Sequence, residues 1–138
     1  MKNPNVSIIG LGYVGLPLAL NFSNKKFKTF GIDNDADKIN KLKNNLSYLT
    51  SISDKEIKTI NKKKIITFTT DYSVIKESKF IIICLPTPLK KNSPDLSYLK
   101  KSIIKISKFL KKKQTIILES TSYPGTTNLL AKNLSKRS

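Results

Sequence analysis

The stretch VSIIGLGYVGLPLA, residues 6–19, decides the fold of this chain. Its apolar start predicts a β-strand, and the apolar residues that recur at helical spacing after it predict an α-helix. Between the two lies the pattern G-x-G-x-x-G, in which Gly10 makes the tight turn, Gly12 leaves backbone open to a pyrophosphate, and Gly15 lets the helix pack close to the strand. The first N–H groups of the helix then face an anion, so the stretch predicts a phosphate-binding turn.

A second strand is predicted over residues 28–32, and an acidic residue follows it directly. Asp33 lies eighteen residues beyond Gly15, close to the spacing of about 20 at which a carboxylate binds the adenosine ribose of a dinucleotide. A carboxylate there would repel the additional 2′-phosphate of NADP, so the sequence predicts NAD as the cofactor. The alternative is a glycine turn in an unrelated α/β protein that binds no nucleotide.

Strands and helices alternate along the rest of the chain. We expect a helix capped by Asn34 or Asp35 that ends near Asn44, helices at 54–62 behind Ser53, at 95–111 behind Asp95 and at 125–135, a short crossover at 71–77, and strands at 64–69, 80–85 and 114–118. Residues 86–94 contain three prolines, so no regular structure is expected there. The alternation predicts one α/β domain over residues 1–138, a doubly wound parallel (Rossmann) sheet that is truncated before a sixth strand. The exposed edge of the strand at 114–118 is then expected to promote association.

The composition is strongly basic, with 26 lysine and arginine residues against 9 acidic ones and a net charge of +17. Such a charge points to an anionic partner. However, all but one of the basic residues are lysines, spread along the chain, whereas arginine is favoured for recognising bases and phosphates. In the helix expected at 95–111 the lysines lie away from the apolar stripe, as on an ordinary solvated face. We therefore expect no nucleic-acid partner.

Cys84 is the only cysteine and histidine is absent, which excludes an intrachain disulfide and predicts no metal site. Cys84 lies in the apolar run at 80–85, where a small core residue is expected. That run is far shorter than the ~20 residues that span a bilayer, and no signal peptide precedes Val6. The expectation is a cytoplasmic protein without a membrane partner.

Two polar loops are expected beside the nucleotide, because ligands of a doubly wound sheet bind at the carboxyl ends of the strands where the strand order reverses. Pro86 and Thr87 follow the fourth strand, and Thr121 and Ser122 follow the fifth. Their hydroxyls are placed to bond the cofactor or to hold a water on the nicotinamide side. The alternative is that each is an ordinary loop hydroxyl whose hydrogen bonds are made locally.

Five ordered segments carry a resemblance: GLGYVGLPLA (10–19), GIDNDADKINKL (31–42), CLPTPL (84–89), PDLSYL (94–99) and ESTSYPGTT (119–127). Together they resemble the N-terminal NAD-binding domain of the UDP-glucose/GDP-mannose dehydrogenase family, and most of all its UDP-N-acetylglucosamine 6-dehydrogenase branch. The resemblance implies oxidation of the C6 primary alcohol of a UDP-sugar to a carboxylate with two NAD+, through a cysteine nucleophile. That cysteine and the sugar pocket belong to central and C-terminal domains of the family, which we expect to lie outside this chain. We therefore expect NAD binding without turnover, and a homodimer when the enzyme is complete.

The resemblance also assigns roles to single residues. It implies Gly10, Gly12, Tyr13, Val14 and Gly15 in the phosphate turn, Asp33 at the ribose, Lys38 near the adenosine, Pro86, Thr87 and Thr121 against the cofactor, Ser122 beside a water at the reacting carbon, and Glu119 at an acidic position of the branch. Asn128 departs from a position that is usually acidic in the family. The alternatives are a UDP-glucose 6-dehydrogenase, another β-hydroxyacid-type dehydrogenase fragment, and a stand-alone nucleotide-binding module without catalysis.

Overall fold

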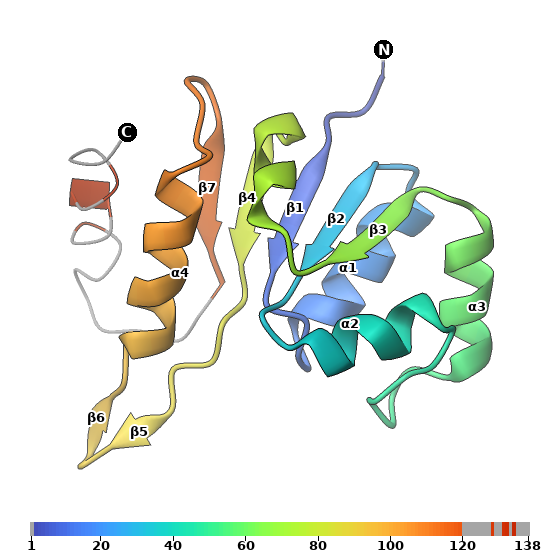
Figure 1. The fold of residues 1–138 in the computed structure, drawn as a ribbon, viewed down its shortest axis with the longest axis horizontal. Coiled ribbons are helices and arrows are strands. Elements are labelled where there is room, and N and C mark those ends of the chain that lie inside the picture. Colours follow the sequence, from blue (N-terminus) through green and yellow to red (C-terminus); the bar gives the residue numbers. More distant parts are fainter. Residues whose placement is uncertain (1, 120–127, 129–130, 133, 135–138) are drawn as a thin grey trace.

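The computed structural model describes residues 2–119, 128, 131, 132 and 134, and these form an α/β domain around one parallel sheet (Figure 1). Within this part of the chain the sheet has five strands: β1 (Val6–Ile9), β2 (Thr29–Ile32), β3 (Ile66–Thr69), β4 (Phe80–Ile83) and β7 (Thr115–Leu118). Their order is β3-β2-β1-β4-β7, and every neighbouring pair is parallel. Because β5 and β6 form a separate small sheet, β7 is the fifth strand of the main sheet along the chain. The order is therefore 3-2-1-4-5 in these terms, which confirms the predicted doubly wound sheet. The helix expected at 125–135 lies largely outside the described residues.

Helical layers cover both faces of the sheet. One layer consists of α1 (Gly15–Asn24), α2 (Ala36–Lys43) and α3 (Asp54–Lys62), and the other of the 3₁₀ helix η1 (Tyr72–Glu77) and α4 (Ser97–Ser107). Successive side chains of a strand point into opposite layers, so Ile8 packs with the first layer and Ile9 with the second. This two-sided burial is why the strands read as continuous apolar runs in the sequence. None of the described helices is long and apolar enough to cross a membrane.

Local side-chain bonds fix where two helices of the first layer begin. The Asp35 carboxylate accepts hydrogen bonds from the backbone N–H groups of Asp37 and Lys38, so Asp35, rather than Asn34, caps α2. Ser53 and Glu56 form a capping box at the start of α3, in which each side chain accepts from the backbone N–H of the other. The predicted start of α3 is therefore confirmed together with its mechanism.

The prediction that residues 86–94 hold no regular structure is wrong. Leu89–Lys90 (β5) pairs antiparallel with Ser93–Pro94 (β6), forming a small hairpin that projects from the end of the sheet (Figure 1). Lys91 and Asn92 make the two-residue turn with φ of 52° and 62°, the left-handed conformation that such hairpins use. A proline is compatible with the pairing because it lies on a short edge strand.

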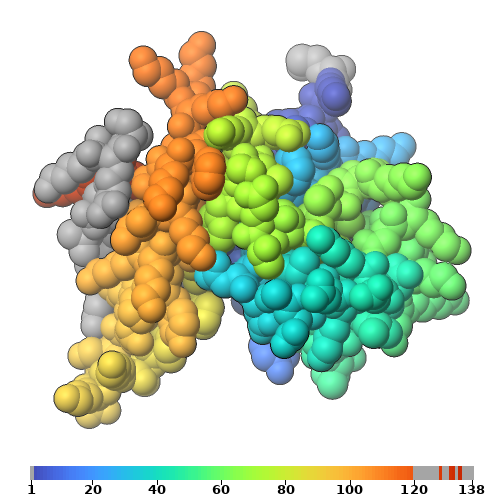
Figure 2. Space-filling view, viewed as in Figure 1, coloured from blue at the N-terminus to red at the C-terminus, as the bar shows by residue number. Residues whose placement is uncertain are grey.

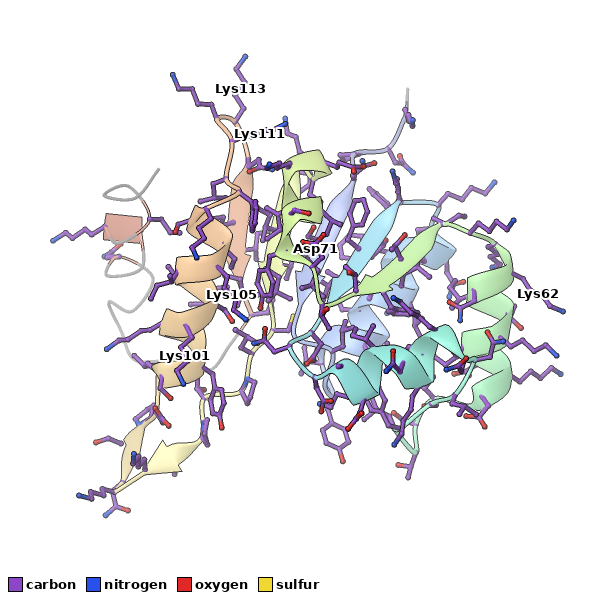
Figure 3. All side chains as sticks on the ribbon, in the orientation of Figure 1. Lys62, Asp71, Lys101, Lys105, Lys111 and Lys113 are labelled. Carbon is purple, nitrogen blue, oxygen red and sulfur yellow. The ribbon has the colours of Figure 1, made fainter. Side chains whose placement is uncertain are left out.

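The helix expected at 95–111 is shorter than predicted and begins differently. It covers Ser97–Ser107, and its N-cap residue is Leu96, so Asp95 is not the cap itself. Asp95 still accepts a hydrogen bond from the Ser97 N–H at 2.9 Å, which lowers the pKa of its carboxyl. Lys105, labelled in Figure 3, is not simply solvated, because its Nζ donates to the Asn34 side chain at 2.9 Å.

Candidate functional site

A crevice of about 790 Å³ lies at the carboxyl ends of the strands. Most of its walls come from the segments that directly follow β1, β2 and β4, with Glu119 contributed from the end of β7. Lys38 of α2, Tyr48 and Leu49 after α2, and Tyr98 of α4 complete the lining. The sheet order reverses between β1 and β4, and ligands of doubly wound sheets bind at that point. The volume falls within the range of ligand pockets. The crevice is therefore the candidate site that the topology selects.

The three glycines of the turn occupy three different environments. Gly10 has a φ of +94°, and a Cβ there would lie 2.6 Å from the Cys84 carbonyl oxygen. A Cβ on Gly15 would lie 1.6 Å from the Gly10 carbonyl oxygen, so only glycine lets α1 start this close to β1. A Cβ on Gly12 would meet no atom within 4 Å. The fold requires glycine at Gly10 and Gly15, whereas at Gly12 the space beside the backbone is open.

The start of α1 is suited to an anion. Its N-cap residue is Val14, whose side chain has no hydrogen-bonding atom. Val14 is 57 % exposed and the neighbouring Tyr13 is 81 % exposed, so the turn is open to the crevice that both residues line. In the first turn of α1 the Leu16 N–H already donates to the Gly12 carbonyl at 3.1 Å and Pro17 has no N–H, so the attraction for a phosphate oxygen comes from the backbone before Leu16 and from the helix dipole.

The Asp33 carboxylate is fixed by two backbone groups. Its Oδ2 accepts from the Leu11 N–H at 2.9 Å, and its Oδ1 accepts from the Asp35 N–H at 2.9 Å. These bonds connect the glycine turn to the loop after β2. A carboxylate has about four acceptor positions, so both oxygens retain capacity for a hydroxyl donor. The structure thus holds the predicted ribose acid rigidly at the edge of the crevice.

Tyr48 is a site residue that the sequence analysis missed. Its hydroxyl donates to the Leu11 carbonyl in the glycine turn, and its ring lies 5.4 Å from Lys38 Nζ. Burial raises the pKa of Tyr48, and the carboxylates of Asp33 and Asp35 raise it further, so the phenol remains a donor. The contact with Leu11 spans 37 residues, and no local pattern in the sequence announces it.

Most predicted site residues line this one crevice. They are Gly10, Gly12, Tyr13, Val14, Asp33, Lys38, Pro86, Thr87 and Glu119. Gly15 lies behind the turn and acts through packing. Thr121 and Ser122 lie outside the described residues. Tyr98 of α4 is a further lining residue that the sequence analysis did not assign.

Cys84 lies at the base of the crevice and belongs to the core, as predicted. Burial raises the pKa of the Cys84 thiol to about 11, and the nearby Glu119 carboxylate adds to the shift. The thiol is therefore protonated at neutral pH, which is the unreactive form. No cluster of three or more potential metal ligands occurs among residues 2–119 or the other described positions.

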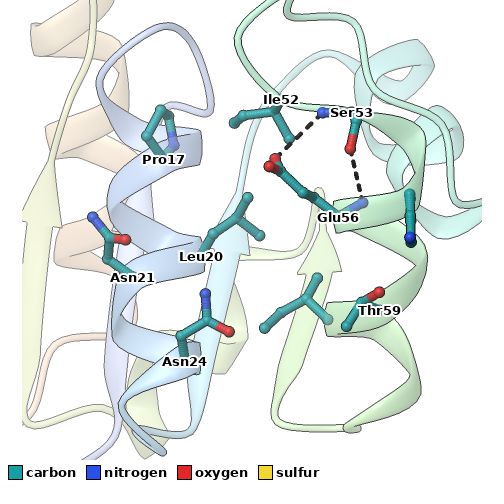
Figure 4. Close-up of a pocket in the computed structure, with 10 residues that line it drawn as sticks. Pro17, Leu20, Asn21, Asn24, Ile52, Ser53, Glu56 and Thr59 are labelled. Carbon is teal, nitrogen blue, oxygen red and sulfur yellow. Dashed lines mark hydrogen bonds between the residues drawn. The ribbon is translucent and has the colours of Figure 1, made fainter.

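A second cavity, of about 520 Å³, lies between α1 and α3 (Figure 4). Leu20 and Asn24 of α1 lie on the side of the helix toward Glu56 and Thr59 of α3, and Asn21 also lines the cavity. Glu56 is engaged in the capping box with Ser53, shown by the dashed lines of Figure 4. No residue predicted to contact a cofactor lines this groove.

A parallel doubly wound sheet with a glycine turn at its switch point and a fixed acid after β2 defines a dinucleotide-binding domain of the Rossmann type. The sequence model of the UDP-glucose/GDP-mannose dehydrogenase family, NAD binding domain, matches residues 4–138. The chain therefore belongs to this family, and the domain is its NAD-binding domain.

Individual relatives agree with this assignment. The chain is 39% identical over 126 residues to the protein CapL of Staphylococcus aureus, covering 91% of this chain and 28% of CapL. It is 35% identical over 128 residues to a UDP-N-acetyl-D-glucosamine 6-dehydrogenase of Pseudomonas aeruginosa, covering 92% of this chain and 29% of that protein. The solved structure of a UDP-D-ManNAc dehydrogenase from Pyrococcus horikoshii superimposes with a TM-score of 0.89 at 31% identity, covering 96% of this chain and 32% of that one. The chain thus spans about three tenths of the length of these relatives.

Proposed function

We propose that the crevice binds NAD in one defined orientation. The pyrophosphate lies on the open backbone of Gly12 at the start of α1, and the adenosine ribose lies against Asp33. The single observation that carries this proposal is the contrast between Gly12, beside which nothing lies within 4 Å, and the two glycines that the fold itself requires. An open position in an otherwise tight turn is where bare backbone is available to a phosphate.

The specificity for NAD over NADP follows from Asp33. Two backbone bonds fix this carboxylate, so it cannot swing away from an additional 2′-phosphate. Lys38 does not neutralise it directly, because its ammonium group lies over the Tyr48 ring. The resulting repulsion disfavours NADP, whereas the ribose hydroxyls of NAD can donate to the same oxygens.

The domain serves a nucleotide-sugar 6-dehydrogenase that oxidises the C6 hydroxymethyl group of a UDP-sugar to a carboxylate with two NAD+. The relatives support this reaction, since one is a UDP-N-acetyl-D-glucosamine 6-dehydrogenase. NAD, when bound, supplies the hydride acceptor. Thr87 and Glu119 line the crevice beyond the glycine turn and are proposed to position the nicotinamide end, with Thr121 and Ser122 following in the chain. The complete enzyme is proposed to be a homodimer.

The chain on its own is proposed to bind NAD without turnover. Cys84 does not replace the nucleophile of the family, because it is buried in the core and protonated. A thiolate in contact with the sugar would be needed for covalent catalysis. The expected result is therefore binding without formation of NADH from UDP-N-acetylglucosamine.

Calorimetric titration with NAD+ and NADP+ tests the proposal. Saturable NAD+ binding is expected, with NADP+ at least about tenfold weaker. Asp33→Ala should weaken the affinity for NAD+ by roughly tenfold to a hundredfold, because a charged hydrogen bond contributes about 1.5–3 kcal/mol to binding. The matched control is Glu77→Ala, which removes an exposed carboxylate far from the crevice and should leave affinity unchanged. Equal affinities for NAD+ and NADP+, or an unchanged affinity in Asp33→Ala, would contradict the proposal.

A further inference from the structure

The fold gathers lysines that are scattered along the sequence at one edge of the sheet, where its strands begin. Lys2 precedes β1, three lysines lie within 25–28 before β2, three at 62–64 before β3, two at 76 and 79 before β4, and three at 111–113 before β7. All twelve amino-edge lysines are exposed, and Glu77 is the only acidic residue in these five segments. The rest of the chain holds eight acidic residues against fourteen basic ones, so the net charge is concentrated at this edge.

Hydrogen bonds and an ion pair hold these segments next to one another. The Lys79 N–H donates to the Asn5 carbonyl at 2.9 Å, and the Thr115 N–H donates to the Lys79 carbonyl at 2.9 Å. Lys28 Nζ lies 3.1 Å from the Glu77 carboxylate, and Lys63 Nζ donates to the Asn24 side chain at 3.2 Å. The starts of all five strands therefore form one continuous surface. Its width is about 19 Å, because neighbouring strands of a sheet lie about 4.8 Å apart.

The turns that bear these lysines favour other residue types on conformational grounds. Lys26, Lys64 and Lys113 have φ values of 67°, 54° and 70°, in the left-handed region where glycine and asparagine are usual. They lie in the turns before β2, β3 and β7 respectively. Lysine at each of these turns adds charge to the edge despite a conformational cost that glycine would avoid.

We propose that this amino edge docks the protein on the surface of an anionic lipid bilayer. Compact ammonium groups on flexible stems suit a laterally extended layer of headgroup phosphates, and each lysine close to such a surface strengthens binding about fivefold. Figure 2 shows the turn before β7 standing out along this edge, and in Figure 3 Lys111 and Lys113 project from it away from the body of the domain. None of the exposed large apolar residues lies in these segments, so docking is electrostatic and involves no insertion.

The edge is less suited to a nucleic acid. It contains no arginine to read bases, and Tyr13 and Tyr98, the exposed tyrosines among the residues that the structure describes, line the crevice. Stacking platforms and bidentate base contacts are therefore missing from the edge. Docking through the amino edge also leaves the crevice, at the opposite ends of the strands, open to the solution. Lysines that are spread in the sequence thus form a patch in space, and the proposal departs from the expectation that the protein has no membrane partner.

The proposal is tested by co-sedimentation with vesicles of phosphatidylcholine that contain phosphatidylglycerol, compared with pure phosphatidylcholine. One variant changes five amino-edge lysines to glutamine, namely Lys25, Lys62, Lys79, Lys111 and Lys112. The control variant makes the same change at five exposed lysines elsewhere, namely Lys41, Lys55, Lys90, Lys100 and Lys101. Both variants lose the same net charge, so a difference between them reports position alone.

The amino-edge variant should bind the anionic vesicles at least about tenfold more weakly than the native chain, while the control stays within about twofold. Equal losses in both variants, no binding of the native chain to the anionic vesicles, or binding to a polynucleotide with none to vesicles would overturn the proposal. A measurement on the native chain needs no variant: lysine acetylation read by mass spectrometry should show protection of the amino-edge lysines on vesicles and none at the control positions. Uniform labelling of both sets would contradict docking through this edge.

Discussion

Changing Gly12 to alanine separates binding from folding. The new methyl group meets no atom within 4 Å, and Gly12 does not share the positive φ of Gly10. Alanine at such a position stabilises a protein by about 0.4–1 kcal/mol, because the unfolded chain loses conformational freedom. The melting temperature should therefore rise by up to about 4 °C.

The same methyl group occupies the space that we assign to the pyrophosphate. It would displace the phosphate from one or two charged backbone hydrogen bonds, each contributing about 1.5–3 kcal/mol. The Kd for NAD+ should then increase roughly tenfold to a hundredfold if one such bond is lost, and up to about ten-thousandfold if two are lost. A more stable protein that binds NAD+ poorly is thus the expected phenotype.

Gly15→Ala provides the matched contrast. Its methyl group would lie 1.6 Å from the Gly10 carbonyl oxygen, so β1 and α1 must move apart. Overpacking of this kind costs about 1–3 kcal/mol or more, and the melting temperature should fall. Thermal unfolding gives the melting temperature of each variant, and calorimetric titration gives its Kd for NAD+. Native NAD+ affinity in Gly12→Ala would refute the placement of the pyrophosphate.

Further predictions concern side chains around the two cavities. Tyr48→Phe keeps the ring but loses the bond to the Leu11 carbonyl, so unfolding free energy should fall by about 0.5–1.5 kcal/mol and NAD+ affinity should weaken; an unchanged affinity would show that the turn does not need this bond. The thiol of Cys84, with a pKa of about 11, should react slowly with iodoacetamide at pH 8 and quickly in denaturant, and rapid labelling of the folded chain would contradict its burial. Because that pKa is raised on folding, stability should decline as pH rises above about 9. Ser53→Ala removes the capping box of α3 and should lower unfolding free energy by about 1 kcal/mol, with NAD+ affinity unchanged in the same titration.

Local patterns in the sequence were sufficient to locate the sheet and the turn. The run around Ile8 and Ile9 predicts a strand, and the glycine spacing predicts the turn after it, because both features depend on neighbouring residues only. The start of α3 follows from Ser53 and Glu56 for the same reason. Asp33 is also found from its spacing to Gly15, since that number of residues is typical of one helix and the strand that follows it.

Features that depend on distant contacts were missed. Tyr48 reaches the glycine turn across 37 residues, and its segment has no periodicity that would mark it. The β5–β6 hairpin was missed because its prolines argue against a strand, while the left-handed turn at Lys91 and Asn92 has no glycine to indicate it. The gathering of lysines was predictable in principle, because each cluster directly precedes a strand and the starts of parallel strands lie at one edge.

NAD is proposed to occupy the crevice at the carboxyl ends of the strands. Titration of the ¹⁵N-labelled chain with NAD+, followed by the backbone amide resonances, tests it most directly. The largest shifts are expected at Gly10, Leu11 and Gly12, with a second group from Asp33 to Lys38. Shifts confined to the groove between α1 and α3, or no saturable shifts at all, would contradict it.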